Sequence, residues 1–128
     1  MKQFWTSYYA KKGTDPMAVS ISAKAPHYFH GRWYLKLAPT WEMINGIRNG
    51  GWSERDYTTA YMEKLEDIDP EQVVNDLEDG SILLCYETSG DFCHRHIAAE
   101  WIQQETGIIV REWVEQKPVR DVDSVLIF

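Results

Sequence analysis

Ser81-Ile82-Leu83-Leu84-Cys85-Tyr86 is the stretch of this sequence from which its fold class follows. A strand with one face in water alternates polar and apolar residues, whereas a strand covered on both faces reads as a continuous apolar run. This run has no polar alternation, so it predicts a strand in the interior of a parallel sheet. Three other stretches, 4–8, 18–22 and 108–113, predict further strands before and after it in the chain.

Four segments carry the start or stop signals of helices. Ser53 and Asp56 have the spacing of a capping box, and Asp69-Pro70 places a cap before a proline at the first helical position. The predicted helices are 39–48, one that begins after Ser53, one from Pro70 that Gly80 ends, and about 93–106, which follows a turn at Ser89-Gly90-Asp91 and ends at Gly107. Residues 23–38 show no clean period and are predicted to form a long loop.

This order of strands and helices indicates an α/β fold. We predict a single three-layer domain over residues 1–128, with a short, mainly parallel sheet and helices on both faces, since 128 residues suit one domain. Ligands of such folds bind beyond the carboxyl ends of the strands. The residues at those ends are Ser7, Tyr8 and Tyr9 for the first strand, Ser22 to Lys24 for the second and 85–95 for the third.

The composition is that of a folded domain, with 44% hydrophobic and 26% charged residues. No stretch approaches the roughly 18 apolar residues of a membrane span, so no membrane partner is expected. The first six residues lack the apolar run of a signal peptide, which predicts a cytoplasmic protein. A reducing cytoplasm would keep the two cysteines as thiols.

The charge is unevenly distributed along the chain. The net charge of −7 argues against general nucleic-acid binding, because phosphate neutralisation supplies most non-specific affinity. Residues 1–41 nevertheless carry six basic residues and one acidic residue, whereas 42–128 carry seven basic and nineteen acidic ones. The stretch 16–41 mixes cations with aromatic rings, which suits a phosphorylated, ring-containing ligand. The alternative is that the rings pack in the core and the lysines lie on the surface by chance.

The densest group of reactive side chains lies between Cys85 and His96. Cys93 is expected at the start of a helix, where the helix dipole and a neighbouring cation lower the pKa of a thiol. This favours Cys93 as a nucleophile and His94 as its base. Arg95 and the free amides of the helix start would form an anion site.

Helical spacing separates the two histidines of this group. His94 falls on the centre line of the apolar stripe of the helix, whereas His96 points nearly opposite and is expected to be solvated. His94 is therefore the candidate for a role at the strand ends, or else a buried histidine that bonds a backbone carbonyl. For Cys85, inside an apolar strand, plain core packing is favoured over a role in a site.

A metal site is not predicted. The spacing Cys-x7-Cys-His-x-His differs from that of common zinc sites, and adjacent Cys93 and His94 on a helix cannot easily bind one tetrahedral ion. A redox pair of Cys85 and Cys93 is a minor interpretation, because seven residues separate them where thioredoxin-type pairs have two. No cofactor is expected.

Several pieces of the chain together resemble a known family. They are Ile82-Leu83-Leu84-Cys85-Tyr86-Glu87, Gly90-Asp91-Phe92-Cys93-His94-Arg95-His96 and Ala99-Glu100-Trp101, with Thr6-Ser7-Tyr8, Ser20-Ile21-Ser22 and Tyr34-Leu35-Lys36-Leu37-Ala38-Pro39 upstream. Over roughly residues 4–106 the chain resembles compact members of the family catalogued as domain of unknown function 488, several of them encoded by phages; a strand and tail follow at 107–128. The resemblance implies an α/β domain whose cysteines and arginine cluster near the strand ends. By analogy, it also implies a link to nucleotide metabolism and prokaryotic conflict systems.

Three functions are compatible with the sequence. The first is a protein that binds an anionic, nucleotide-like small molecule, and in a phage it would sequester a host signal nucleotide. The second is an enzyme with Cys93 as nucleophile and His94 as base, acting on a nucleotide or nucleoside. The third is a protein inhibitor with exposed aromatic anchors. The oligomeric state is left open. The candidate catalytic residues are Cys93 and His94, and the candidate ligand-binding residues are Arg95, Cys85, Glu87, Ser7, Tyr8, Ser22, Lys24, Tyr28, Trp33 and Lys36.

Overall fold

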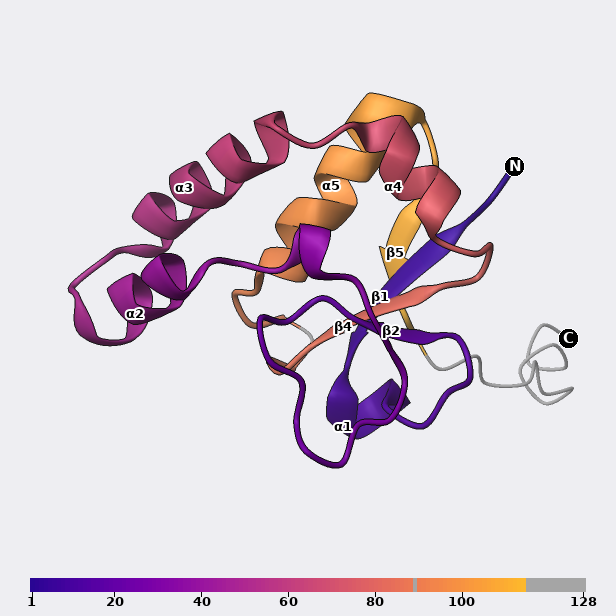
Figure 1. Cartoon of the computed structure of the whole chain (residues 1–128), viewed down its shortest axis with the longest axis horizontal. Helices are drawn as coiled ribbons and strands as arrows, with labels where there is room; N and C mark the ends of the chain where they lie inside the picture. Colours follow the sequence, from indigo (N-terminus) through magenta and orange to yellow (C-terminus); the bar gives the residue numbers. More distant parts are fainter. Residues whose placement is uncertain (89, 115–128) are drawn as a thin grey trace, which may run out of the picture.

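A parallel sheet forms the centre of the computed structural model, which describes residues 1–88 and 90–114 (Figure 1). Within these residues the sheet has five strands in the order β3-β2-β4-β1-β5, and every pairing between neighbours is parallel. The strands are β1 (Phe4–Tyr8), β2 (Ala18–Ser20), β3 (Arg32–Trp33), β4 (Ile82–Cys85) and β5 (Val110–Glu112). The apolar strand β4 lies between β2 and β1, which confirms the predicted interior position and the α/β fold.

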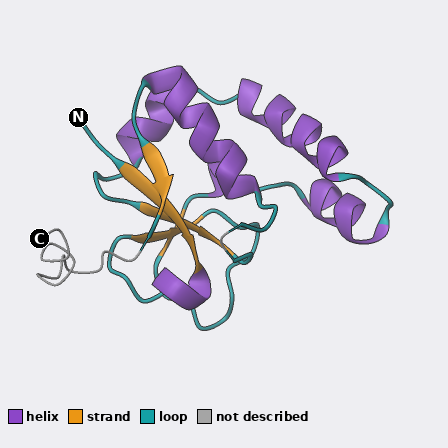
Figure 2. Ribbon diagram, turned by 180° about the vertical axis from the view of Figure 1, so that it is seen from behind, coloured by secondary structure: helices purple, strands orange, loops and turns teal. Residues whose placement is uncertain are grey.

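The longer helices cover one face of the sheet. They are α2 (Trp41–Asn49), α3 (Glu54–Glu66), α4 (Pro70–Asp76) and α5 (His94–Thr106). Their apolar side chains pack with Leu83 of β4 and Phe4 of β1 in the larger hydrophobic core. Figure 2 shows these helices gathered on one side of the strands.

The opposite face has a thinner cover. The four-residue helix α1 (Tyr9–Lys12) and the loop that carries Phe29 pack there against Ile82 and Leu84. The predicted third layer is therefore one short helix plus a loop. The alternation of Leu83 toward one face and Ile82 and Leu84 toward the other explains why the whole run had to be apolar.

Local sequence signals explain where the helices begin and end. The Ser53 side chain accepts a hydrogen bond from the Asp56 amide, and Asp56 accepts one from the Ser53 amide, so both halves of the capping box form. Asp69 caps α4. Gly107 adopts the left-handed conformation at φ 77° and ends α5, as predicted.

Several predicted boundaries were wrong. The helix that Gly80 was expected to end stops at Asp76, and Gly80 instead lies in the turn before β4 with φ 88°. The predicted loop 23–38 contains β3 and a 3-10 turn, η1 (Leu35–Leu37). Ser89 of the predicted turn and residues 115–128 of the tail lie outside the described residues. No helix in the described part of the chain has the length and apolar character to cross a membrane.

Candidate functional site

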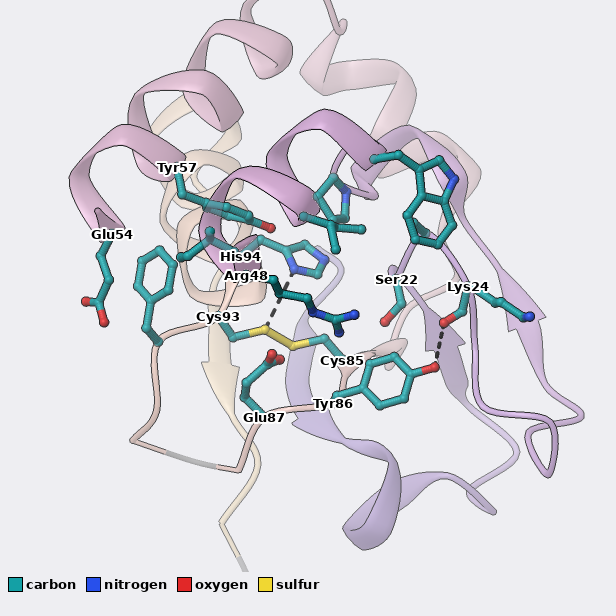
Figure 3. Close-up of a pocket in the computed structure, with 16 residues that line it drawn as sticks. Ser22, Lys24, Arg48, Glu54, Tyr57, Cys85, Tyr86, Glu87, Cys93 and His94 are labelled. Atoms are coloured by element: carbon teal, nitrogen blue, oxygen red, sulfur yellow. Dashed lines mark hydrogen bonds between the residues drawn. A yellow bond between two sulfur atoms is a disulfide. The ribbon is translucent and has the colours of Figure 1, made fainter. Parts of the chain in front are cut away.

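A cavity of about 490 Å³ opens at the carboxyl ends of β2 and β4 (Figure 3). We call it the strand-tip pocket. The residues after β2 and β4 form its floor, the start of α5 forms its back, and α2 and α3 form the opposite wall. Its lining residues are Ser22, Ala23, Lys24, Pro39, Trp41, Ile44, Ile47, Arg48, Glu54, Tyr57, Cys85, Tyr86, Glu87, Phe92, Cys93 and His94.

The two cysteines meet in this pocket. Cys85 ends β4 and Cys93 is the residue before α5, and their sulfur atoms form a disulfide. The expectation that both cysteines are thiols was therefore wrong for this structure, whereas Cys85 is buried as expected for a core residue. The reason is tertiary: the turn after β4 brings the chain back on itself, so residues eight positions apart face each other.

His94 is held in one tautomer by its contacts. Its Nε2 lies 2.6 Å from the Ile21 carbonyl oxygen, which can only accept, so Nε2 carries the proton. Nδ1 then presents its lone pair 3.7 Å from Cys93 Sγ. Burial lowers the pKa of His94 to about 4, and Arg95 adds to the effect, so the ring is neutral at physiological pH.

Arg95 lies behind the pocket and does not line it. Its side chain is fully buried and makes two hydrogen bonds to the Glu112 carboxylate, at 3.0 and 2.8 Å. The same guanidinium donates to Cys85 Sγ at 3.0 Å and to the Glu87 carbonyl at 2.6 Å. The structure does not place Arg95 in the anion site predicted for it, because its buried side chain binds the Glu112 carboxylate and the end of β4.

Other side chains supply the charge of the pocket. Lys24 and Arg48 are cationic and Glu54 and Glu87 are anionic, so the wall has both signs. Burial raises the pKa of Tyr57, and the Glu87 carboxylate raises it further. The rings of Trp41, Tyr57 and Tyr86 add flat apolar surface to the same cavity. The Tyr86 hydroxyl donates to the Lys24 carbonyl at 2.6 Å, which ties the ends of β2 and β4 together.

The structure brings together only part of the predicted set. Cys93, His94, Cys85, Glu87, Ser22 and Lys24 line the strand-tip pocket. Trp33 lines a neighbouring cavity of about 300 Å³ that shares Ser22, Ala23 and Lys24 with it. The predicted residues that line neither cavity are Ser7, Tyr8, Tyr28, Lys36 and Arg95.

The residues outside the cavities have other neighbours. Ser7 is fully buried in β1, and the Tyr8 ring lies 5.9 Å from the Arg95 guanidinium. Lys36 pairs with Asp76 at 3.5 Å, and Tyr28 is 55% exposed. These positions give no support to a direct ligand contact, because strand-end position alone does not say on which side of the sheet a side chain lies.

Sequence reasoning missed the wall made by α2 and α3. Trp41 and Arg48 come from α2, and Glu54 and Tyr57 come from α3. The strand-end rule points to loops after strands and says nothing of a helical hairpin that folds over them. The only available signal was the helical pair itself, with an aromatic and a charged residue on each helix.

His96 is also placed differently from the prediction. It is half-buried, and its Nε2 is buried with no hydrogen-bond partner among the described residues. Burial lowers its pKa, and Arg95 contributes in the same direction. The prediction of a solvated His96 was wrong, because the ring is half-buried and interacts with Arg95 and Glu112.

Three of these side chains have donor atoms close enough to share a metal ion. The donor atoms of Cys85, Cys93 and His94 all lie within 4.8 Å of one another, and all three residues are buried. The premise that Cys93 and His94 both lie on the helix was wrong. Cys93 has extended backbone, with φ −156° and ψ 145°, so it precedes the helix instead of belonging to it.

Comparison with known proteins gives one family. A protein-family model described as the active DUF488-N3 subclade matches residues 8–106. No curated protein and no solved structure matches the chain. The matched region contains the whole lining of the strand-tip pocket.

Proposed function

This chain belongs to the DUF488 family, and from that premise we propose that it binds an anionic, nucleotide-like small molecule in the strand-tip pocket. The observation that carries the proposal is the combination of Lys24 and Arg48 with several aromatic rings around one cavity at the strand ends. Cations contact phosphate, and the rings of Trp41, Tyr57 or Tyr86 stack on a base. A volume of about 490 Å³ suits a ligand of nucleotide size.

Arg48 tests the proposal most directly. It is exposed near the end of α2 and lines the pocket, so its removal takes away one cation without opening the core. Arg48→Ala should weaken nucleotide binding roughly ten- to hundredfold, the range of a lost charge-assisted hydrogen bond. The measurement is calorimetric titration with a panel of mono-, di- and cyclic nucleotides.

Arg55→Ala is the matched control, because Arg55 is an exposed cation on α3 that does not line the pocket. It should leave the affinity unchanged. Equal affinities for wild type and Arg48→Ala would overturn the proposed site. If no nucleotide binds at all, the exposed Trp33 and Trp41 become the leading feature, and the inhibitor hypothesis takes first place.

A second candidate function is favoured by the contact between Cys93 Sγ and His94 Nδ1. After a dithiol reduces the disulfide, Cys93 would be a nucleophile whose proton passes to His94. The matching family model is described as an active subclade, which is compatible with this candidate. Cys93→Ser separates the two: a sequestering protein keeps its function in that variant, whereas an enzyme still binds but no longer converts its substrate.

A further inference from the structure

We propose that reduction of the Cys85–Cys93 disulfide creates a Zn²⁺ site made of Cys85, Cys93 and His94, with its fourth position open to the strand-tip pocket. The inference goes beyond the proposed function, because it concerns the sulfur and imidazole atoms and does not depend on which anion the pocket binds.

The spacing of the donor atoms fits a tetrahedral ion. With Zn–S about 2.3 Å and Zn–N about 2.0–2.1 Å, a tetrahedral site puts a sulfur and a nitrogen about 3.6 Å apart. Cys93 Sγ and His94 Nδ1 are 3.7 Å apart. Cys85 Sγ lies within 4.8 Å of both. The Cα atoms of the two cysteines are 7.3 Å apart, which leaves room for the sulfurs to separate around an ion.

The surroundings of these donors match those of metal ligands. A histidine that binds a metal through one nitrogen almost always donates its other N–H to a carbonyl or carboxylate. Here His94 Nε2 donates to the Ile21 carbonyl and leaves Nδ1 for the ion. The Arg95 guanidinium donates to Cys85 Sγ at 3.0 Å, which stabilises that sulfur as a thiolate. Arg95 is itself anchored by Glu112.

The position of the site points to an open coordination sphere. Three protein ligands with a fourth position left for water or substrate are typical of catalytic zinc, whereas structural zinc has four protein ligands. All three residues line the strand-tip pocket. Glu87 lines it too, and its carboxylate points toward the sulfur atoms in Figure 3, where it would accept a proton from a metal-bound water.

Reduction of the disulfide precedes metal binding. A dithiol transfers two electrons and two protons to the Cys85–Cys93 disulfide and becomes a disulfide itself. Zn²⁺ then displaces the two thiol protons and binds two thiolates and one neutral imidazole, so the ion and its ligands have no net charge. Two thiolates and an imidazole are a donor set that suits Zn²⁺.

Cobalt spectroscopy tests the site in the whole protein. Wild-type protein reduced with a phosphine should bind one Co²⁺ per chain, with sulfur-to-cobalt charge transfer and the visible bands of a tetrahedral ion. Zn²⁺ should abolish this spectrum by displacement. Oxidised wild type should show none of it. Cys85→Ser and Cys93→Ser should lose much of the charge transfer, and His94→Ala should bind at least about tenfold more weakly.

His96→Ala is the matched control, because His96 stands on the same helix but its ring is not among the clustered donors. It should bind Co²⁺ as the wild type does. Reduced wild type without charge transfer at equimolar cobalt would overturn the proposal, as would an unchanged spectrum in both serine variants.

A second measurement uses only the wild-type protein, so it tests the site even if the variants fail to fold. Zn²⁺ should protect both reduced cysteines from alkylation by iodoacetamide, which mass spectrometry measures. Alkylation that is as fast with Zn²⁺ as without it would contradict the site. Nucleotide titration of the same sample with a chelator distinguishes the two proposals. Nucleotide affinity without the metal supports the binding pocket independently of the zinc site. Metal binding without nucleotide affinity supports the zinc site and contradicts the proposed function.

Discussion

Arg95 is the largest fully buried side chain of the described residues. A buried guanidinium is tolerated only where hydrogen bonds replace its hydration. Glu112 on β5, the Glu87 carbonyl and Cys85 Sγ all accept from it. One side chain on α5 thus connects the end of β4 to the edge strand β5 and fixes the backbone next to the disulfide.

The main effect of replacing Arg95 should be a lower free energy of unfolding. Arg95→Ala leaves the Glu112 carboxylate without this partner in a largely buried place, and breaking a fully buried pair costs about 3–5 kcal/mol. Because the Glu112 side chain is 22% exposed, we expect a smaller loss, roughly 2–4 kcal/mol. Urea unfolding measures it.

The exposed Arg55→Ala is the control for this variant and should change the free energy of unfolding by less than about 0.5 kcal/mol. An Arg95→Ala protein as stable as the wild type would show that the ion pair does not hold the sheet edge. The same variant tests whether Arg95 contacts the ligand. Loss of nucleotide affinity with unchanged stability would show that Arg95 is a ligand contact after all.

At the scale of elements, the α2–α3 hairpin supplies the pocket wall that no strand-end rule could find. Its α3 half begins at a complete capping box, so its first turn, which carries Glu54 and Tyr57, is well defined. Tyr61 further along the helix donates to the Leu37 carbonyl at 2.6 Å and packs against the His94 ring. The helix therefore joins the wall to the centre of the site.

Ser53→Ala should destabilise the protein by about 1 kcal/mol, the usual cost of a lost N-cap. Thermal unfolding should show a correspondingly lower Tm, and exchange of the amides at the start of α3 should become faster. Thr59→Ala serves as control because Thr59 is exposed within the same helix. A wild-type Tm for Ser53→Ala would mean that tertiary packing alone holds the first turn of α3.

The loop between β2 and α2 shows where local patterns stopped being informative. Residues 23–38 were predicted as loop because their aromatic residues follow no period. The structure has β3 and η1 there; β3 pairs with β2, and side chains of this segment reach the distant α4 region. Tyr34 donates to Asp76 at 2.7 Å and Arg32 pairs with Glu78 at 2.9 Å. Partners more than forty residues away cannot be recognised from the local sequence.

At the scale of the molecule, the disulfide closes a short loop between the central strand and α5. A loop of this size removes enough freedom from the unfolded chain to stabilise the native state by about 2–3 kcal/mol. Reduced protein in a chelator should therefore unfold at lower urea concentration than oxidised protein. Identical urea midpoints for the two forms would show that the disulfide does not stabilise the fold. Added Zn²⁺ should raise the midpoint of the reduced form if the metal site exists.

The sequence alone determined four of the five described strands, the interior place of β4 and the starts of α3 and α4. A run such as Ile82–Cys85 must be covered on both faces, and a cap such as Ser53 acts on amides only two or three positions away, so both features can be read locally. Only the tertiary structure decided the direction in which Arg95 points, the meeting of Cys85 with Cys93, and the place of Arg48 in the pocket. These depend on how helices pack across the sheet, which brings together residues that share no local pattern.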